Sequence, residues 1–123
     1  MANADHRECL HIGDFDAEHD YIVARNSLKE LKGIYQAGIG NTQEVSYSHR
    51  SIALFLVLIG ADDFFAIHNH SSGSLEASEN DLVADGYMKG LGNMLEIPCI
   101  GTYIMTDIGW VNVTSNKIEY FNE

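Results

Sequence analysis

Residues 64–81 read FFAIHNHSSGSLEASEND, and the fold is inferred outward from this stretch. Phe64–Ile67 is a short apolar run that predicts a central strand, and it leads directly into two histidines. Ser78 and Asp81 match the pattern of a helix N-cap followed by an acidic residue in the first turn. The stretch therefore predicts a buried strand, a polar connection that turns at Gly73, and the start of a helix.

The two histidines and the aspartate have a spacing that suits a metal site. If the strand runs on through His70, the side chains of His68 and His70 project to the same face, because side chains alternate along a strand. A carboxylate from Asp81, in the first turn of the next helix, can then converge on the same point. Two imidazoles and one carboxylate leave the fourth position of a tetrahedral zinc open for water, as in catalytic rather than structural sites.

Simpler explanations account for the same residues. Two histidines two apart are common at protein surfaces, and Ser78 with Asp81 can form a capping box whether or not a metal is bound. The letters His-Asn-His also spell the name of the HNH nucleases, but in that motif the residues are scattered along a ββα unit. The remaining histidines have no partner at ligand spacing: His6, His11, His19 and His49.

The composition limits the classes of function. The chain has 123 residues, of which 46% are hydrophobic, so it is long enough for one domain with its own core. Seven basic and eighteen acidic side chains give a formal charge of −11, which argues against nucleic-acid binding and favours cationic partners or bound metal ions. The cysteines, Cys9 and Cys99, do not form a disulfide framework, and this favours a reducing cytoplasm.

No segment reads as a membrane anchor. The N-terminal residues have no apolar core of the kind that a signal peptide needs. The longest apolar run, residues 52–61, is about half the length required to cross a bilayer. It suits a buried helix or a buried strand, and we favour a helix because polar residues open it and Gly60 follows it.

The rest of the sequence predicts further strands before, between and after two helices along the chain. Residues 1–19 read as a polar arm and residues 20–123 as the domain. The expected strands and helices cover residues 21–24, 31–37, 51–59 (helix), 64–67, 79–96 (helix), 100–105 and 110–113. This order predicts an α/β or α+β sandwich in which helices cover a sheet.

The motif and its surroundings resemble those of a known family. His68-Asn69-His70, ten residues and Asp81 are similar to the JAMM motif, H-x-H-x(10)-D, of the JAB/MPN metallopeptidase superfamily. The RadC-like branch, whose usual form is HNHPSG…PS..D, is the most similar. The resemblance extends over roughly residues 20–113: Leu31–Gln36 resembles the strand before the family's Gly-containing loop, and Ser48–Arg50 takes the place of Tyr-Pro-Arg or His-Pro-Arg.

The resemblance implies both a fold and a chemistry. The expected fold is the cytidine-deaminase-like α/β three-layer sandwich, a mixed sheet flanked by helices. His68, His70 and Asp81 would hold Zn²⁺, and Ser78 would lie beside the metal and stabilise the oxyanion of a tetrahedral intermediate. Known hydrolases of the superfamily cut amide and isopeptide bonds, so a peptide or protein tail is the expected substrate or ligand.

Three departures from the family pattern affect this expectation. Ser71 replaces the usual Pro, and Gly101-Thr102 stands where the branch has Asp-His. Gln36 occupies the position of the Glu that acts as general base on the metal's water, and we expect it to lie beside that water. An amide can orient a water but cannot take its proton, and general-base catalysis is worth about 10²–10⁴ in rate.

A neighbouring glutamate is the alternative base. Glu44 lies just past the Gly38–Gly40 stretch and can replace the missing carboxylate, whereas Glu30 is about 20 Å along the strand from Gln36. Two hypotheses follow. The chain is either a zinc-dependent peptidase or isopeptidase, or a non-catalytic JAB module that keeps the metal and binds a peptide tail or partner protein. The pattern leaves the oligomeric state open.

Overall fold

The computed structural model describes residues 18–40, 48–70 and 73–121. The predicted helix at the apolar run and the predicted helix start at Glu79 are both confirmed, whereas the last strand was not predicted. The elements in chain order are β1 (Glu18–Arg25), β2 (Leu31–Gly40), α2 (His49–Ile59), β3 (Asp63–Asn69), α3 (Glu79–Leu95), β4 (Cys99–Met105), β5 (Gly109–Asn112) and β6 (Lys117–Tyr120).

The strands form one mixed sheet in the order β2-β1-β3-β4-β5-β6. The pairing of β3 with β4 is parallel, and the other neighbouring pairs are antiparallel. β3 is internal, as its apolar sequence predicted, and six of its seven residues are buried. An α/β fold is therefore confirmed.

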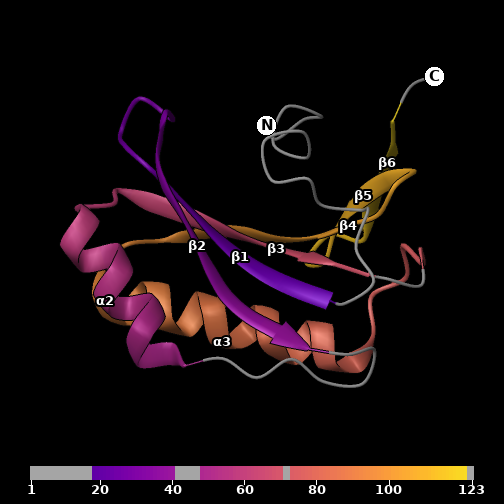
Figure 1. Ribbon diagram of the computed structural model, residues 1–123, viewed down its shortest axis with the longest axis horizontal. Coiled ribbons are helices and arrows are strands. Elements are labelled where there is room, and N and C mark those ends of the chain that lie inside the picture. The colour runs from indigo at the N-terminus through magenta and orange to yellow at the C-terminus, as the bar shows by residue number, and fades with distance from the viewer. Residues whose placement is uncertain (1–17, 41–47, 71–72, 122–123) are drawn as a thin grey trace.

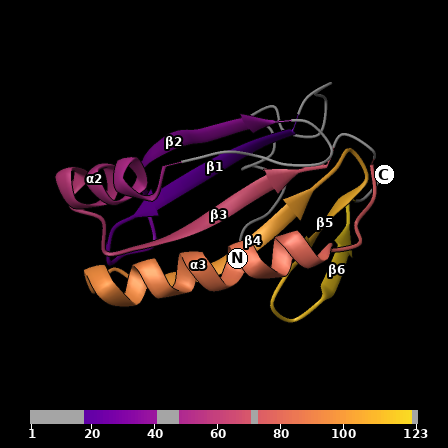
Figure 2. The ribbon, with the colours of Figure 1, turned by 90° about the horizontal axis from the view of Figure 1, so that it is seen from below.

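Both helices lie on the same face of the sheet (Figure 1). α2 connects β2 to β3 and α3 connects β3 to β4, and both connections move in the same direction across the sheet (Figure 2). Crossovers between parallel strands are almost always right-handed, so two that move in the same direction place their helices on one side. The described residues therefore form two layers, the mixed sheet and the two helices that cover one face of it.

Alternate side chains of the central strands pack into two separate hydrophobic cores, one on each face of the sheet. Phe64 and Ala66 of β3 pack with α2 and α3, together with Ile22 of β1. Phe65 and Ile67 point to the other face, where they pack with Tyr103 and Trp110, among others. By this alternation, His68 projects from the face that carries the helices.

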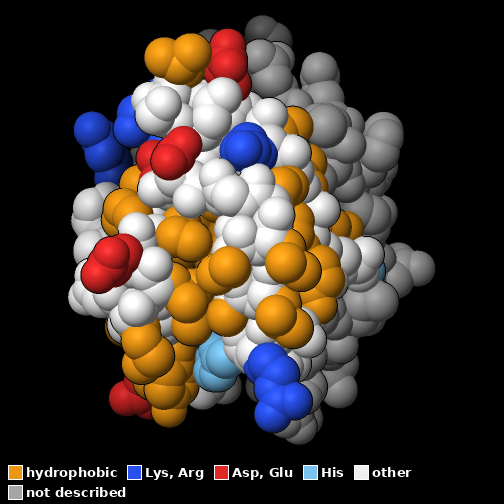
Figure 3. Space-filling model, turned by 90° about the vertical axis from the view of Figure 1, so that its left-hand side faces the viewer, with side chains coloured by type: hydrophobic (Ala, Val, Ile, Leu, Met, Phe, Trp, Pro, Cys, Tyr) orange, Lys and Arg blue, Asp and Glu red, His pale blue; other side chains and the backbone are white. Residues whose placement is uncertain are grey.

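The outer side of the helical layer is apolar over α2. Leu54, Val57 and Leu58 are more than half exposed, and Figure 3 shows hydrophobic side chains gathered on this end of the molecule. Within the described residues, no helix combines the length and the apolar character needed to cross a membrane. The division between an arm at residues 1–19 and the domain stays a prediction, since residues 1–17 lie outside the described residues.

Candidate metal centre

The two histidines of the motif lie where β3 ends. His68 is within β3, and His70 follows it, with a backbone N–H that donates to the carbonyl of Met105 on β4 at 3.2 Å. This bond continues the extended backbone beyond the strand, so both imidazoles project from the same side of the sheet. The centroids of the two rings are 5.0 Å apart, and the ring planes are nearly perpendicular.

The third residue comes from the start of α3. Ser78 is the N-cap, and a capping box joins it to Asp81 in both directions. Oδ2 of Asp81 accepts hydrogen bonds from the backbone N–H of Ser78 at 2.8 Å and from its hydroxyl at 2.9 Å. The capping explanation and the metal explanation are therefore compatible, because the cap holds the carboxylate in place while Oδ1 stays directed towards His68.

The carboxylate of Asp81 is strongly favoured in its charged form. Burial alone would raise its pKa, but the hydrogen bond from His70 and those from Ser78 lower the pKa of Asp81 to about 2. Asp81 is therefore an anion at neutral pH, ready to bind a cation.

The three side chains form a group of metal-ligand atoms. One atom from each of His68, His70 and Asp81 lies within 4.8 Å of the others. Nε2 of His70 is 3.1 Å from Oδ2 of Asp81, and Nε2 of His68 is 3.9 Å from Oδ1. Ligands bonded at about 2.0 Å to a tetrahedral zinc are about 3.3 Å apart, so the observed separations fit an ion of that size after small adjustments.

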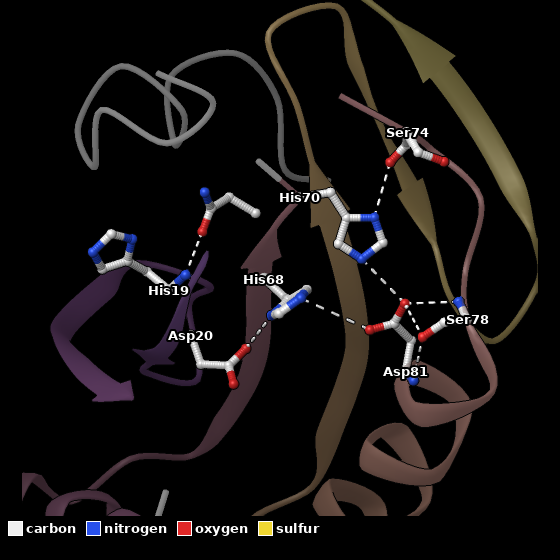
Figure 4. A network of polar contacts seen from close by, with 8 residues as sticks. His19, Asp20, His68, His70, Ser74, Ser78 and Asp81 are labelled. Carbon is white, nitrogen blue, oxygen red and sulfur yellow. Dashed lines mark hydrogen bonds and ion pairs between the residues drawn. The ribbon is translucent and has the colours of Figure 1, made fainter. Parts of the chain in front are cut away.

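In each of the two imidazoles, the nitrogen that faces away from Asp81, Nδ1, lies within hydrogen-bond distance of an acceptor (Figure 4). Nδ1 of His68 is 2.8 Å from Oδ1 of Asp20, and Nδ1 of His70 is 2.9 Å from the backbone carbonyl of Ser74. A backbone carbonyl can only accept, so Nδ1 of His70 donates to Ser74, and a proton on Nδ1 of His68 would likewise donate to Asp20. Nε2 of His70 contacts the carboxylate of Asp81, and a bound metal would take the place of that contact. Metal-binding histidines usually have such a second hydrogen bond, which fixes the tautomer and the ring orientation.

Asp20 is the site residue that the sequence analysis missed. It is 48 residues from His68 along the chain, with no spacing relation to the motif, and it lies directly opposite His68 in the pairing of β1 with β3. Its only sequence signal is its place immediately before the apolar residues 21–24, in the first half of β1. Asn69, which is fully buried, accepts a hydrogen bond from the backbone N–H of His19 and so fixes the adjacent residue of β1.

Gln36 is not brought to this side of the sheet. It is exposed and lies opposite Tyr21, whose partner on β3 is Ile67. Paired residues project to the same face and neighbouring residues to opposite faces, so Gln36 shares the face of Ile67 rather than that of His68. A role for Gln36 in catalysis stays a prediction, as does a role for Glu44, which lies outside the described residues.

Thr102 stands where the family has a histidine, and the structure shows its surroundings. It is buried on β4 opposite Ala66, and its hydroxyl has no hydrogen-bond partner among the described residues. It takes no part in the hydrogen bonds that hold His68, His70 and Asp81. The support for His68 comes instead from β1.

The comparisons with known proteins agree with this geometry. A search of curated proteins found no match. The model of the RadC-like JAB domain family matches residues 3–118, which is most of the chain. The fold and the His68, His70 and Asp81 group are those expected of that family, and the chain therefore belongs to the RadC-like JAB domain family.

Proposed function

We propose that this chain is a zinc-binding hydrolase domain that acts on peptide or isopeptide bonds, with His68, His70 and Asp81 as the ligands. One observation carries the proposal: the three ligand atoms lie within 4.8 Å of one another. A set of two imidazoles and one carboxylate suits zinc and leaves a fourth position for water or substrate. When bound, the ion would polarise a carbonyl and lower the pKa of a coordinated water.

The chain's own residues then have defined tasks. Ser78 and the carbonyl of Ser74 hold Asp81 and His70 in place from the helix cap and the preceding loop. The hydroxyl of Ser78 lies beside the ligand carboxylate, and we assign it the stabilisation of negative charge on a substrate oxygen. The net charge of −11 favours metal loading and a cationic or neutral peptide tail over an acidic one.

The free thiol of Cys99 suits a reducing compartment, and we place the protein in the cytoplasm. The substrate would then be a peptide tail present in the same compartment.

A second candidate is a JAB module that holds zinc and binds a tail without cutting it. The position of Gln36 favours this candidate, because Gln36 projects from the face opposite to that of His68. A Gln amide could in any case not accept a proton from water. Loss of a general base usually costs about 10²–10⁴ in rate.

A single set of measurements separates the two candidates. Protein purified without added zinc is analysed for bound metal, titrated with zinc by calorimetry, and assayed against a panel of isopeptide-linked substrates. The hydrolase proposal expects one zinc per chain and turnover that His70→Ala abolishes. Binding of one zinc together with binding but no cleavage of a tail would support the second candidate, and absence of zinc binding would overturn both.

A further inference from the structure

We propose that Asp20 is a positioning residue that holds His68 in the tautomer with its proton on Nδ1, so that Nε2 is available to the metal. The inference rests on the proposed zinc site, but its main prediction concerns the metal-free protein. Asp20 would not touch the metal or the substrate and would act only through His68.

The contact is short, partly buried and placed by backbone pairing. Oδ1 of Asp20 is 2.8 Å from Nδ1 of His68, and the side chains are 19% and 13% exposed. The two residues are direct partners in the antiparallel pairing of β1 with β3, so both side chains project to the helix-bearing face. Figure 4 shows Asp20 and Asp81 on opposite sides of the His68 ring.

The two histidines differ in how their tautomers are held. Nδ1 of His70 donates to the backbone carbonyl of Ser74, four residues away, and this acceptor remains whatever side chain occupies position 74. Nδ1 of His68, by contrast, is 2.8 Å from a side-chain carboxylate on another strand, which a substitution can remove. A neutral imidazole carries its proton on either nitrogen, and for His68 the carboxylate of Asp20, at 2.8 Å from Nδ1, is closer than that of Asp81, at 3.9 Å from Nε2, so it favours the proton on Nδ1. Without Asp20, a proton on Nε2 would point at the ligand position and block it.

The position of Asp20 is itself reinforced next to the site. The side chain of Asn69, between the two histidines, accepts the backbone N–H of His19, the residue before Asp20. Asn69 is fully buried, so this bond is shielded from water. The intervening Asn thus supports the alignment of β1, and through it the carboxylate that faces His68.

The test compares Asp20→Asn with the matched variant Asp63→Asn, the same substitution at the other end of the β1–β3 pairing. The histidine tautomers are read by long-range ¹⁵N–¹H NMR of the full metal-free chain, and zinc affinity is measured by competition with a chelator. Because an amide can donate as well as accept, Asp20→Asn should move His68 from the Nδ1–H form towards the Nε2–H form. It should weaken zinc binding by about 10–100-fold. Asp63→Asn should change neither quantity.

Asp20→Glu serves as the conservative variant and should recover most of the Nδ1–H form, since it restores the carboxylate. An unchanged His68 tautomer in folded Asp20→Asn, or zinc affinity within twofold of native, would overturn the inference. A shifted tautomer in a protein that binds no zinc would support the role of Asp20 and overturn the proposed function. Recovery by Asp20→Glu distinguishes loss of the hydrogen bond from general loss of folding.

Discussion

The pairing of β1 with β3 carries an acid–base pair at each end, and the two ends differ in how their charge is balanced. At one end, Arg25 lies opposite Asp63 and makes two hydrogen bonds to it, at 2.9 and 3.0 Å. Lys29 adds a third contact at 3.4 Å. At the other end, Asp20 lies opposite His68 and makes one contact at 2.8 Å.

The difference lies in the supply of positive charge. The guanidinium of Arg25 forms an ion pair with Asp63, so the chain itself neutralises this carboxylate. At the His68 end, two carboxylates face two imidazoles, and none of the hydrogen bonds described there comes from a lysine or arginine. The same backbone geometry therefore produces a closed ion pair at one end and, at the other, a cluster that gains from an added cation.

The largest expected effect comes from breaking the ion pair of Arg25 with Asp63, which we call the closed end of the β1–β3 pairing. Arg25→Met removes the main partner of a carboxylate whose side chain is 9% exposed, and leaves it buried and charged. We expect a loss of about 3 kcal/mol in the free energy of unfolding, measured with urea, with zinc affinity unchanged. As a control, Lys29→Met should cost less than about 1 kcal/mol, because Lys29 is 65% exposed. Equal losses from the two variants would contradict this account of the closed end.

The second prediction tests whether the cluster at the other end, around His68, needs a cation. At a zinc concentration of a hundred times Kd, the native chain should be stabilised by about 2.7 kcal/mol, and His70→Ala should lose this gain. Thermal unfolding with and without zinc measures both. If zinc stabilises His70→Ala as much as the native chain, the ion binds elsewhere.

The third prediction uses pH to compare the ends. Burial would raise the pKa of Asp63, but hydrogen bonds and charges from Arg25 and Lys29 lower it below its ordinary value. Its stabilisation is therefore complete above the unfolded-state pKa of about 3.9 and is lost as the pH falls through the lower pKa of the folded state. Urea unfolding from pH 5 downwards should show a smaller acid loss for Asp63→Asn than for the native chain. Parallel curves would show that Asp63 does not drive the acid dependence.

The smallest expected effect concerns Gln36. Because Gln36 projects from the face opposite to that of His68, Gln36→Glu should change zinc affinity by less than about twofold, despite the added negative charge. Calorimetric titration of the two proteins checks this. Zinc binding that tightens tenfold would place residue 36 beside the ligands and restore its role at the water position.

The parts of the site that could be predicted from sequence depend on local rules. Alternation along a strand placed His68 and His70 on one side, and the capping pattern placed Asp81 in the first turn of α3. These rules need only the residues of one short segment. The helix predicted over residues 51–59, which the structure extends to His49–Ile59, followed in the same way from its polar start and from Gly60, which is in the left-handed conformation at the C-cap.

The parts that could not be predicted depend on pairing between distant segments. The contact of Asp20 with His68 requires the register of β1 on β3, which no local pattern encodes. The face of Gln36 depends on an irregularity in the β1–β2 pairing between Asp20 and Tyr21, and a shift of one residue reverses the face of every side chain. The two-layer arrangement likewise depends on the strand order, which sets the direction of both crossovers.

The spacing of the ligands along the chain has a consequence for folding. All three ligands come from residues 68–81, and closing so short a loop costs little entropy, so an unfolded chain can also capture the ion. Such capture would nucleate the β3–α3 unit early, but binding to the unfolded state reduces the stability that the metal adds. Asp20 joins the cluster only when β1 has paired with β3. Under the proposed zinc site, this contact would make the affinity of the folded chain for the ion higher than that of a partly folded chain.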